Sequence, residues 1–200
     1  MKSIMMSIKP KWVAKILNRE KTIEVRKQFP FDYVGWVYIY CTKEETHWKY
    51  PYVNEKSVRS ELGNCSWWAE YGEDSIAINE RTIFEYKAFK CRGKVVARFW
   101  CDKVEDYGNG CLWRNKNKSY SDYEKILKPS CLTDDELYDY CEDLCFYAIY
   151  ITKLEIFETP RDISEFKHEV HIRDNVRGWY YDIATLKRPP QSWLRIIEGE

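Results

Sequence analysis

Residues 7–27 read SIKPKWVAKILNREKTIEVRK, and this stretch predicts a short helix, a turn and a charged strand in succession. Pro10 suits the first turn of a helix. Apolar residues then recur at helical spacing, so we expect a helix over about residues 11–18. After the polar turn the residue pattern changes to strict alternation, which is typical of a strand, and we expect that strand over residues 22–27.

The predicted strand carries charge on one face only. In an extended chain Thr22, Glu24 and Arg26 point to one side, and the apolar residues between them point to the other. Lys21 stands where the strand begins, and its long side chain can bend over the polar face. The sequence therefore predicts a Lys/Thr/Glu/Arg cluster on one rigid element. The alternative is a solvated strand whose charges pair across the sheet, each pair contributing at most about 1 kcal/mol.

The same region is locally basic. Residues 9–27 contain seven basic and two acidic side chains, and Lys9 opens this positive patch. The whole chain has no net charge and a pI near 6.8, which removes the argument from a globally basic surface. Any electrostatic case for nucleic-acid binding must therefore be local.

Two motifs resemble the ASCH domain family of the PUA-like superfamily, in its bacterial or phage type. The first is SIKPK followed by EKTIEVRK, in which Lys21, Glu24 and Arg26 match the family hallmark Lys-x-x-Glu-x-Arg. The second is RPPQSW at residues 188–193, which resembles the family's closing motif. The two motifs stand in the family's order. We expect a single domain over residues 1–200, with insertions at about 44–90 and 105–143 that match no part of the family.

The resemblance implies an α+β fold, a PUA-like small mixed or antiparallel β-barrel with short flanking helices. Residue patterns favour the same class, because strands are predicted without a repeated strand-helix-strand order. The predicted strands, rich in β-branched and aromatic residues, cover residues 4–8, 22–27, 36–42, 94–103, 146–157 and, at the edge, 194–197. A second helix is predicted over 134–144 after the capping signal that begins at Thr133, and a short third one after Pro160.

Composition limits the class of protein. The chain has 200 residues, of which 44% are apolar and 16% aromatic, so it can build a sizeable core. No apolar run is long enough to cross a bilayer, and the first residues lack the apolar segment of a secretory signal. We expect a cytoplasmic protein without membrane contact.

The eight cysteines do not predict a metal site. No Cys-x-x-Cys pair occurs, and the only conceivable zinc ligands (Cys131, Cys141, Cys145 and His171) are irregularly spaced. Buried cysteine often acts as a small apolar residue, and cytosolic thiols stay reduced. We expect no metal and no cofactor.

The resemblance implies that the protein binds RNA or a nucleotide-like ligand in a cleft beside the barrel. The residues expected to bind the ligand are Lys9, Lys21, Thr22, Glu24, Arg26, Gln191, Ser192 and Trp193. The basic side chains would contact phosphate or the polar edge of a base, and Glu24 would orient Arg26. Gln191, Ser192 and Trp193 would either close the barrel or contact the ligand directly.

One branch of the family suggests an enzyme instead, an amidohydrolase that removes the acetyl group from N4-acetylcytidine. In that branch a lysine matched by Lys21 is the general base and a threonine matched by Glu24 is the nucleophile. Glu24 cannot take that part, and a carboxylate beside Lys21 favours the protonated amine. If the protein is catalytic, Thr22 would be a shifted nucleophile or Glu24 would activate water. We expect binding rather than catalysis.

A third class of function is a phage or prophage accessory protein that contacts another protein through aromatic insertions. The first insertion is rich in aromatic residues (Trp48, Tyr50, Tyr52, Trp67, Trp68, Tyr71, Phe84 and Tyr86). These rings would anchor the insertion to the barrel or stack on bases. The aromatic run from Trp179 to Tyr181 would line a cleft or wedge a loop.

Overall fold

The computed structural model describes residues 2–43, 75–79, 86–90, 92–107, 120–141, 146–174 and 178–197. Most of the first expected insertion lies outside these ranges. The aromatic residues predicted there from Trp48 to Phe84 are among those outside them, and so is Cys145.

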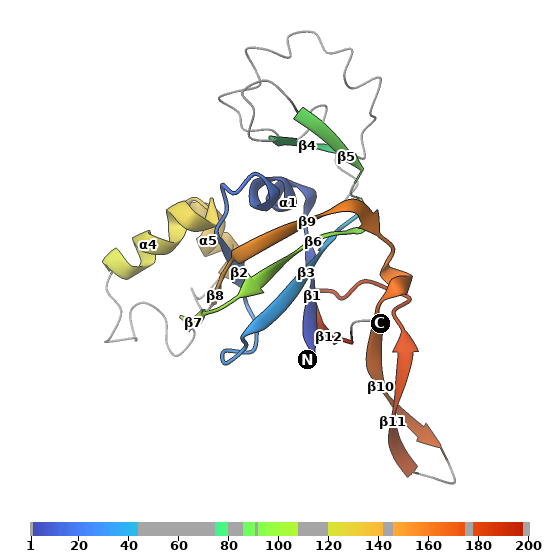
Figure 1. The fold of residues 1–200 in the computed structure, drawn as a ribbon. Helices are drawn as coiled ribbons and strands as arrows, with labels where there is room; N and C mark the ends of the chain where they lie inside the picture. The colour runs from blue at the N-terminus through green and yellow to red at the C-terminus, as the bar shows by residue number, and fades with distance from the viewer. Residues whose placement is uncertain are drawn as a thin grey trace.

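A five-stranded sheet forms the centre of the molecule (Figure 1). Its strands, in spatial order, are β12 (Trp193–Ile196), β1 (Ser3–Ile8), β3 (Gly35–Cys41), β6 (Val95–Cys101) and β9 (Thr152–Arg161). Neighbours pair antiparallel, except that β1 and β3 run parallel. The predicted final edge strand is confirmed, because β12 pairs only with β1 in this sheet.

Both faces of β1 are buried, as expected for an interior strand of a sheet that is covered on both faces. Ile4 and Met6 pack on the side of α1 (Pro10–Leu17), while Met5 packs on the opposite side with Tyr38 and Phe166. The predicted first helix is confirmed, with its proline in the first turn and its apolar face on the core.

A three-stranded antiparallel sheet lies beside the first one. It contains β2 (Ile23–Arg26), β8 (Tyr147–Tyr150) and β7 (Val104–Asp106), with β8 in the middle. Two helices, α4 (Tyr120–Ser130) and α5 (Asp134–Cys141), supply Ile126 and Leu137 to a core shared with Ile23 and Val25. The second expected insertion therefore covers one face of β2.

The capping signal at the start of α5 is confirmed. The Glu136 N–H donates to Oγ1 of Thr133, and the Thr133 N–H donates back to the Glu136 carboxylate, both at 3.1 Å. This reciprocal pair satisfies two backbone donors at the beginning of the helix.

The expected closed barrel is not seen in the described part of the chain. The predicted strand 146–157 divides at Ile151, and its halves, β8 and β9, enter different sheets. The predicted strand 94–103 ends at Cys101, and the chain enters the other sheet only at Val104. A barrel needs a continuous ladder around its circumference. No ladder among the described residues joins the edge strands β9 and β12, so the fold is α+β with open sheets.

Two hairpins complete the described structure. The first pairs β4 (Ser75–Asn79) with β5 (Tyr86–Lys90), and the second pairs β10 (Lys167–Asp174) with β11 (Gly178–Thr185). The second hairpin extends away from the central sheet (Figure 1). The short helix expected after Pro160 is the 3-10 turn η1 (Ile163–Glu165). None of the helices in the described ranges has the length and apolarity needed to cross a membrane.

Candidate functional site

The closing motif is fixed to the central sheet by several directional contacts. The Trp193 indole N–H donates to the Gln28 carbonyl at 2.8 Å, and the ring meets Phe29 edge-on. From β1, the Ser7 N–H donates to the Ser192 carbonyl at 2.9 Å, and the Ser7 hydroxyl donates to the Pro190 carbonyl at 2.5 Å. These bonds hold an otherwise irregular segment in one conformation.

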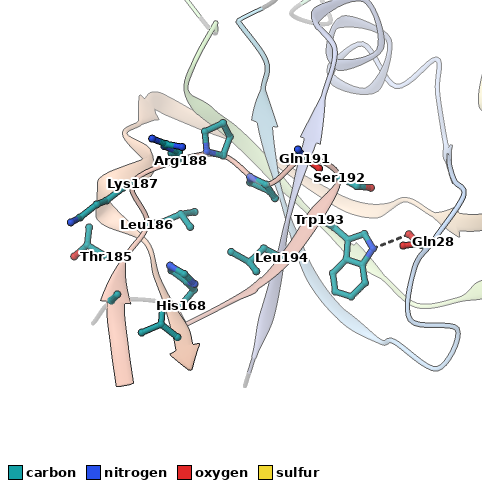
Figure 2. Close-up of a pocket in the computed structure, with 14 residues that line it drawn as sticks. Gln28, His168, Thr185, Leu186, Lys187, Arg188, Gln191, Ser192, Trp193 and Leu194 are labelled. Carbon is teal, nitrogen blue, oxygen red and sulfur yellow. Dashed lines mark hydrogen bonds between the residues drawn. The ribbon is translucent and has the colours of Figure 1, made fainter. Parts of the chain in front are cut away.

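An open groove of about 750 Å³ runs along this segment (Figure 2). Its near wall comprises Lys187, Arg188, Gln191, Ser192 and Trp193, and its far wall is the β10–β11 hairpin. No acidic side chain in the described part of the chain lines the groove. Lys187 and Arg188 are exposed at the rim of the groove, and no ion pair among the described residues involves either side chain.

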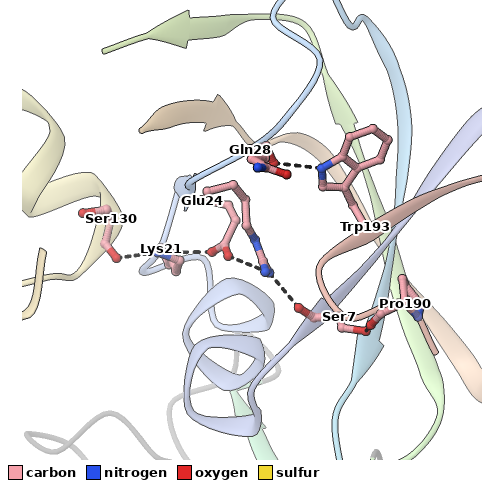
Figure 3. A network of polar contacts seen from close by, with 8 residues as sticks. Ser7, Lys21, Glu24, Gln28, Ser130, Pro190 and Trp193 are labelled. Atoms are coloured by element: carbon pink, nitrogen blue, oxygen red, sulfur yellow. Dashed lines mark hydrogen bonds and ion pairs between the residues drawn. The ribbon is translucent and has the colours of Figure 1, made fainter. Parts of the chain in front are cut away.

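The predicted Lys21, Glu24 and Arg26 cluster forms a continuous buried network (Figure 3). Lys21 Nζ donates to the Ser130 carbonyl at 2.6 Å and lies 3.3 Å from Glu24 Oε2. Arg26 Nη2 lies 3.0 Å from Glu24 Oε1 and donates to the Ser7 carbonyl at 2.7 Å. The network therefore runs from the end of α4, through β2, to β1.

The polar face of β2 is turned into the protein, so the alternative of a solvated strand is wrong. The side chains of Lys21, Glu24 and Arg26 are only 2%, 7% and 11% exposed. The ring of Trp12 lies 5.1 Å from Lys21 Nζ. Two cations and one carboxylate are buried together, and such a group is tolerated only because hydrogen bonds compensate its desolvation.

Burial shifts the pKa of Lys21. Removal from water lowers the pKa of Lys21 below its ordinary value, and the opposing effect of Glu24 is smaller. From the sequence we expected Glu24 to favour the charged amine, and Glu24 does act in that direction. The local pattern did not show how deeply the amine is buried, and burial has the larger effect on its pKa.

The network leaves one donor group without a partner. Nε of Arg26 is buried and makes no hydrogen bond within the described part of the chain. A buried donor of this kind costs free energy unless an acceptor reaches it. Arg26 therefore retains hydrogen-bonding capacity after contacting Glu24 and Ser7.

Two expected ligand-binding residues, Lys9 and Thr22, lie outside both the network and the groove. Lys9 is exposed, and its carbonyl accepts the backbone N–H groups of Trp12 and Val13 at the start of α1. Thr22 is also exposed, and its backbone bonds to Pro129 and Ile151 join β2 to neighbouring segments.

Five further residues belong to the site and were not predicted as part of it: Ser7, Ser130 and Pro190 through their hydrogen bonds, and Lys187 and Arg188 in the groove. Ser7 and Pro190 lie in the two motifs that resemble the ASCH family, so their place in the sequence could have predicted that they belong to the site. Ser130 comes from the second insertion, and no pattern in the sequence connects it with Lys21.

Comparison with known proteins identifies the fold. No protein-family model and no curated protein matches the chain. Solved structures do match: the ASCH protein of Zymomonas mobilis is 14% identical, with a TM-score of 0.50 over 97% of this chain and 87% of that chain. A mutant of the same protein gives 14% identity and a TM-score of 0.51 over 98% and 90%. A second mutant gives 14% and 0.50 over 97% and 87%.

These matches assign the open-sheet α+β arrangement to a known class of domain. The chain has an ASCH-like fold over almost its whole length. Its similarity to the Zymomonas mobilis protein is one of backbone architecture.

Proposed function

We propose that this protein binds RNA or a nucleotide-like ligand in the groove along residues 186–193. The Lys21–Glu24–Arg26 network would be the buried support that holds the groove in shape. The observation that carries the proposal is the junction at Ser7, which accepts a hydrogen bond from Arg26 and donates one to Pro190. The two motifs that resemble the ASCH family are thereby joined.

The groove offers the contacts that a nucleotide requires. Lys187 and Arg188 supply cations for phosphate, and a guanidinium can bind phosphate through two parallel hydrogen bonds. Gln191 and Ser192 supply donors and acceptors for the edge of a base. The half-buried Trp193 supplies an aromatic surface. With no acidic side chain among the described residues of the lining, an anionic ligand is favoured.

The network has a different role from the one inferred from sequence. The polar atoms of Lys21 and Glu24 contact other groups of the protein, so these residues position the site rather than contact the ligand. Arg26 contacts Glu24 and Ser7, its Nε is buried, and it does not line the groove, so it too would support the groove from behind.

Salt dependence tests the proposal. A labelled single-stranded RNA should bind more weakly as salt rises, with a slope in log K against log salt of about −0.7 for each phosphate that the protein neutralises. The Lys187→Ala/Arg188→Ala variant should lower affinity and make the slope shallower by roughly 0.7 for each phosphate that is no longer neutralised.

The matched control is Lys103→Ala/Lys128→Ala, which removes the same charge from elsewhere on the protein. Neither residue lines the groove. This control should behave as the wild type does. The proposal would be contradicted if RNA affinity did not change with salt concentration and was the same in the Lys187→Ala/Arg188→Ala variant as in the wild type.

A second candidate is hydrolysis of N4-acetylated cytidine. One observation favours it, because burial lowers the pKa of Lys21, the direction that a general base at neutral pH requires. Its amine, however, faces Ser130 and Glu24 and is almost inaccessible to substrate. Release of acetate from N4-acetylcytidine by the wild type, and its loss in Lys21→Met, would establish this activity.

A further inference from the structure

The β10–β11 hairpin presents an aromatic face to solvent. Trp179, Tyr181 and Ile183 alternate along β11 and therefore lie on one side of the hairpin. They are 70%, 69% and 56% exposed. Their partners across the ladder are Arg173, His171 and Glu169, respectively. We call these six residues the outer face.

The two rings are supported from the neighbouring strand. The His171 ring lies 4.3 Å from the Tyr181 ring, centroid to centroid, and the Arg173 guanidinium lies 5.8 Å from the Trp179 ring. Cross-strand pairs of this kind stabilise a hairpin, and a two-stranded hairpin is only marginally stable in water. The rings nevertheless leave most of their surface open, and exposed apolar clusters commonly mark binding sites.

We propose that the outer face is a stacking platform for single-stranded nucleic acid, on which two successive bases lie against Trp179 and Tyr181. This inference rests on the proposed function and extends it, because the ligand becomes a strand of several nucleotides instead of one nucleotide. Residues two apart on a strand are separated by about 6.8 Å, so an extended nucleic acid can place one base on each ring.

Charge favours a nucleic acid over an acidic or apolar partner. The single carboxylate of the outer face, Glu169, is paired with Lys2 at 2.7 Å. Arg173 stands beside Trp179 and can contact the phosphate between the two bases. With Glu169 neutralised by Lys2, the Arg173 guanidinium is the remaining charge on the outer face, which therefore combines aromatic rings with a local positive charge, as sites for single strands do.

The outer face and the proposed groove share the β10–β11 hairpin. The opposite face of the same hairpin supplies His168, Val170 and Ala184 to the groove wall, and β11 ends at Thr185, which also lines it. Lys187 and Arg188 follow directly in the chain. A strand whose phosphates occupy the groove rim can thus pass over the base of the hairpin to reach the rings.

The test compares two probes on the intact protein: a labelled single-stranded RNA of about 12 nucleotides and cytidine monophosphate. The Trp179→Ala/Tyr181→Ala variant should weaken RNA binding roughly a hundredfold, about tenfold for each ring. Its affinity for the mononucleotide should be unchanged. Trp179→Phe/Tyr181→Phe keeps both rings and should restore RNA affinity to within about threefold of the wild type. Tyr138→Ala, which removes a ring of 59% exposure from α5, is the control and should have no effect.

The outcomes separate this inference from the proposed function. If the wild type binds both probes and the alanine pair binds RNA normally, the platform is refuted while the groove remains. If the wild type binds neither probe, both proposals fail. If sedimentation instead shows a dimer that the alanine pair abolishes, with RNA affinity unchanged, the outer face joins two copies of the chain and the platform is wrong.

Discussion

Replacing Glu24 with Gln tests whether the buried network stabilises the fold through charge. Glu24 faces Lys21 with one oxygen, at 3.3 Å, and Arg26 with the other, at 3.0 Å. Glutamine has the same shape but only one acceptor oxygen. Whichever way its amide is turned, one of the two cations faces an NH₂ group, and both lose the compensating negative charge.

The expected loss is large because the site excludes water. Removing one partner of a buried ion pair costs about 3–5 kcal/mol. Burial already lowers the pKa of Lys21. Loss of the proton from this amine in the variant would therefore reduce the free-energy cost of an unpaired buried charge. We therefore expect about 3 kcal/mol, at the lower end of that range. For a chain of this length, this corresponds to a fall in Tm of roughly 6–12 °C.

The pH dependence has a definite sign. Loss of Glu24 lowers the folded-state pKa of Lys21 further, while the unfolded value stays near about 10.4. The unfolded chain then binds more protons than the folded one across a wider range below that value, and stability rises with pH where this holds. The destabilisation by Glu24→Gln should consequently be smaller near pH 9 than near pH 7.

Urea unfolding followed by tryptophan fluorescence measures both effects. The control is Glu155→Gln, which breaks a pair with Arg98 at 2.7 Å but on a side chain that is 49% exposed. This control should lose less than about 1 kcal/mol, because water screens the pair. Equal losses in the two variants, or a Glu24→Gln protein as stable as the wild type, would refute the reasoning.

Two further predictions concern titrating groups away from the site. Lys94 and Ser164 hold the pKa of Asp162 below its ordinary value, so its stabilising effect is present at neutral pH and is lost as pH falls below about 3.9. Asp162→Asn should therefore lower the free energy of unfolding near pH 7 by less than about 1 kcal/mol, and its effect should shrink progressively as pH falls below about 3.9. Burial raises the pKa of Cys101 to about 12, and its thiol donates to the Lys103 carbonyl. Iodoacetamide should leave Cys101 unmodified in the native protein and alkylate it in urea; a peptide map with alkylated Cys101 from native protein would contradict this.

Local patterns predicted the elements around the site well. The helix after Pro10, the alternation through Glu24 and the capping pair at Thr133 all depend on residues within a few positions of one another. Backbone geometry fixes these periods wherever the segment lies in the fold. The ASCH-like fold also follows from the two motifs and their order.

Longer-range features were not predictable in the same way. Whether sheets close depends on which edge strands meet, and the break at Ile151 sends β8 and β9 into different sheets. The outer face was also missed, because the aromatic run at 179–181 is compatible with a buried wedge or an exposed strand. Exposure is decided by what packs against a segment.

The sequence by itself determined that Glu24 and Arg26 share one side of a short strand and that Lys21 stands at its start within reach of them, since alternation is a property of extended backbone. Only the tertiary structure decided that this side is dry, that Lys21 reaches a carbonyl 109 positions away and that Arg26 meets the closing motif through Ser7. Desolvation and the pKa of a buried amine depend on distant segments that exclude water, and no local spacing encodes their approach.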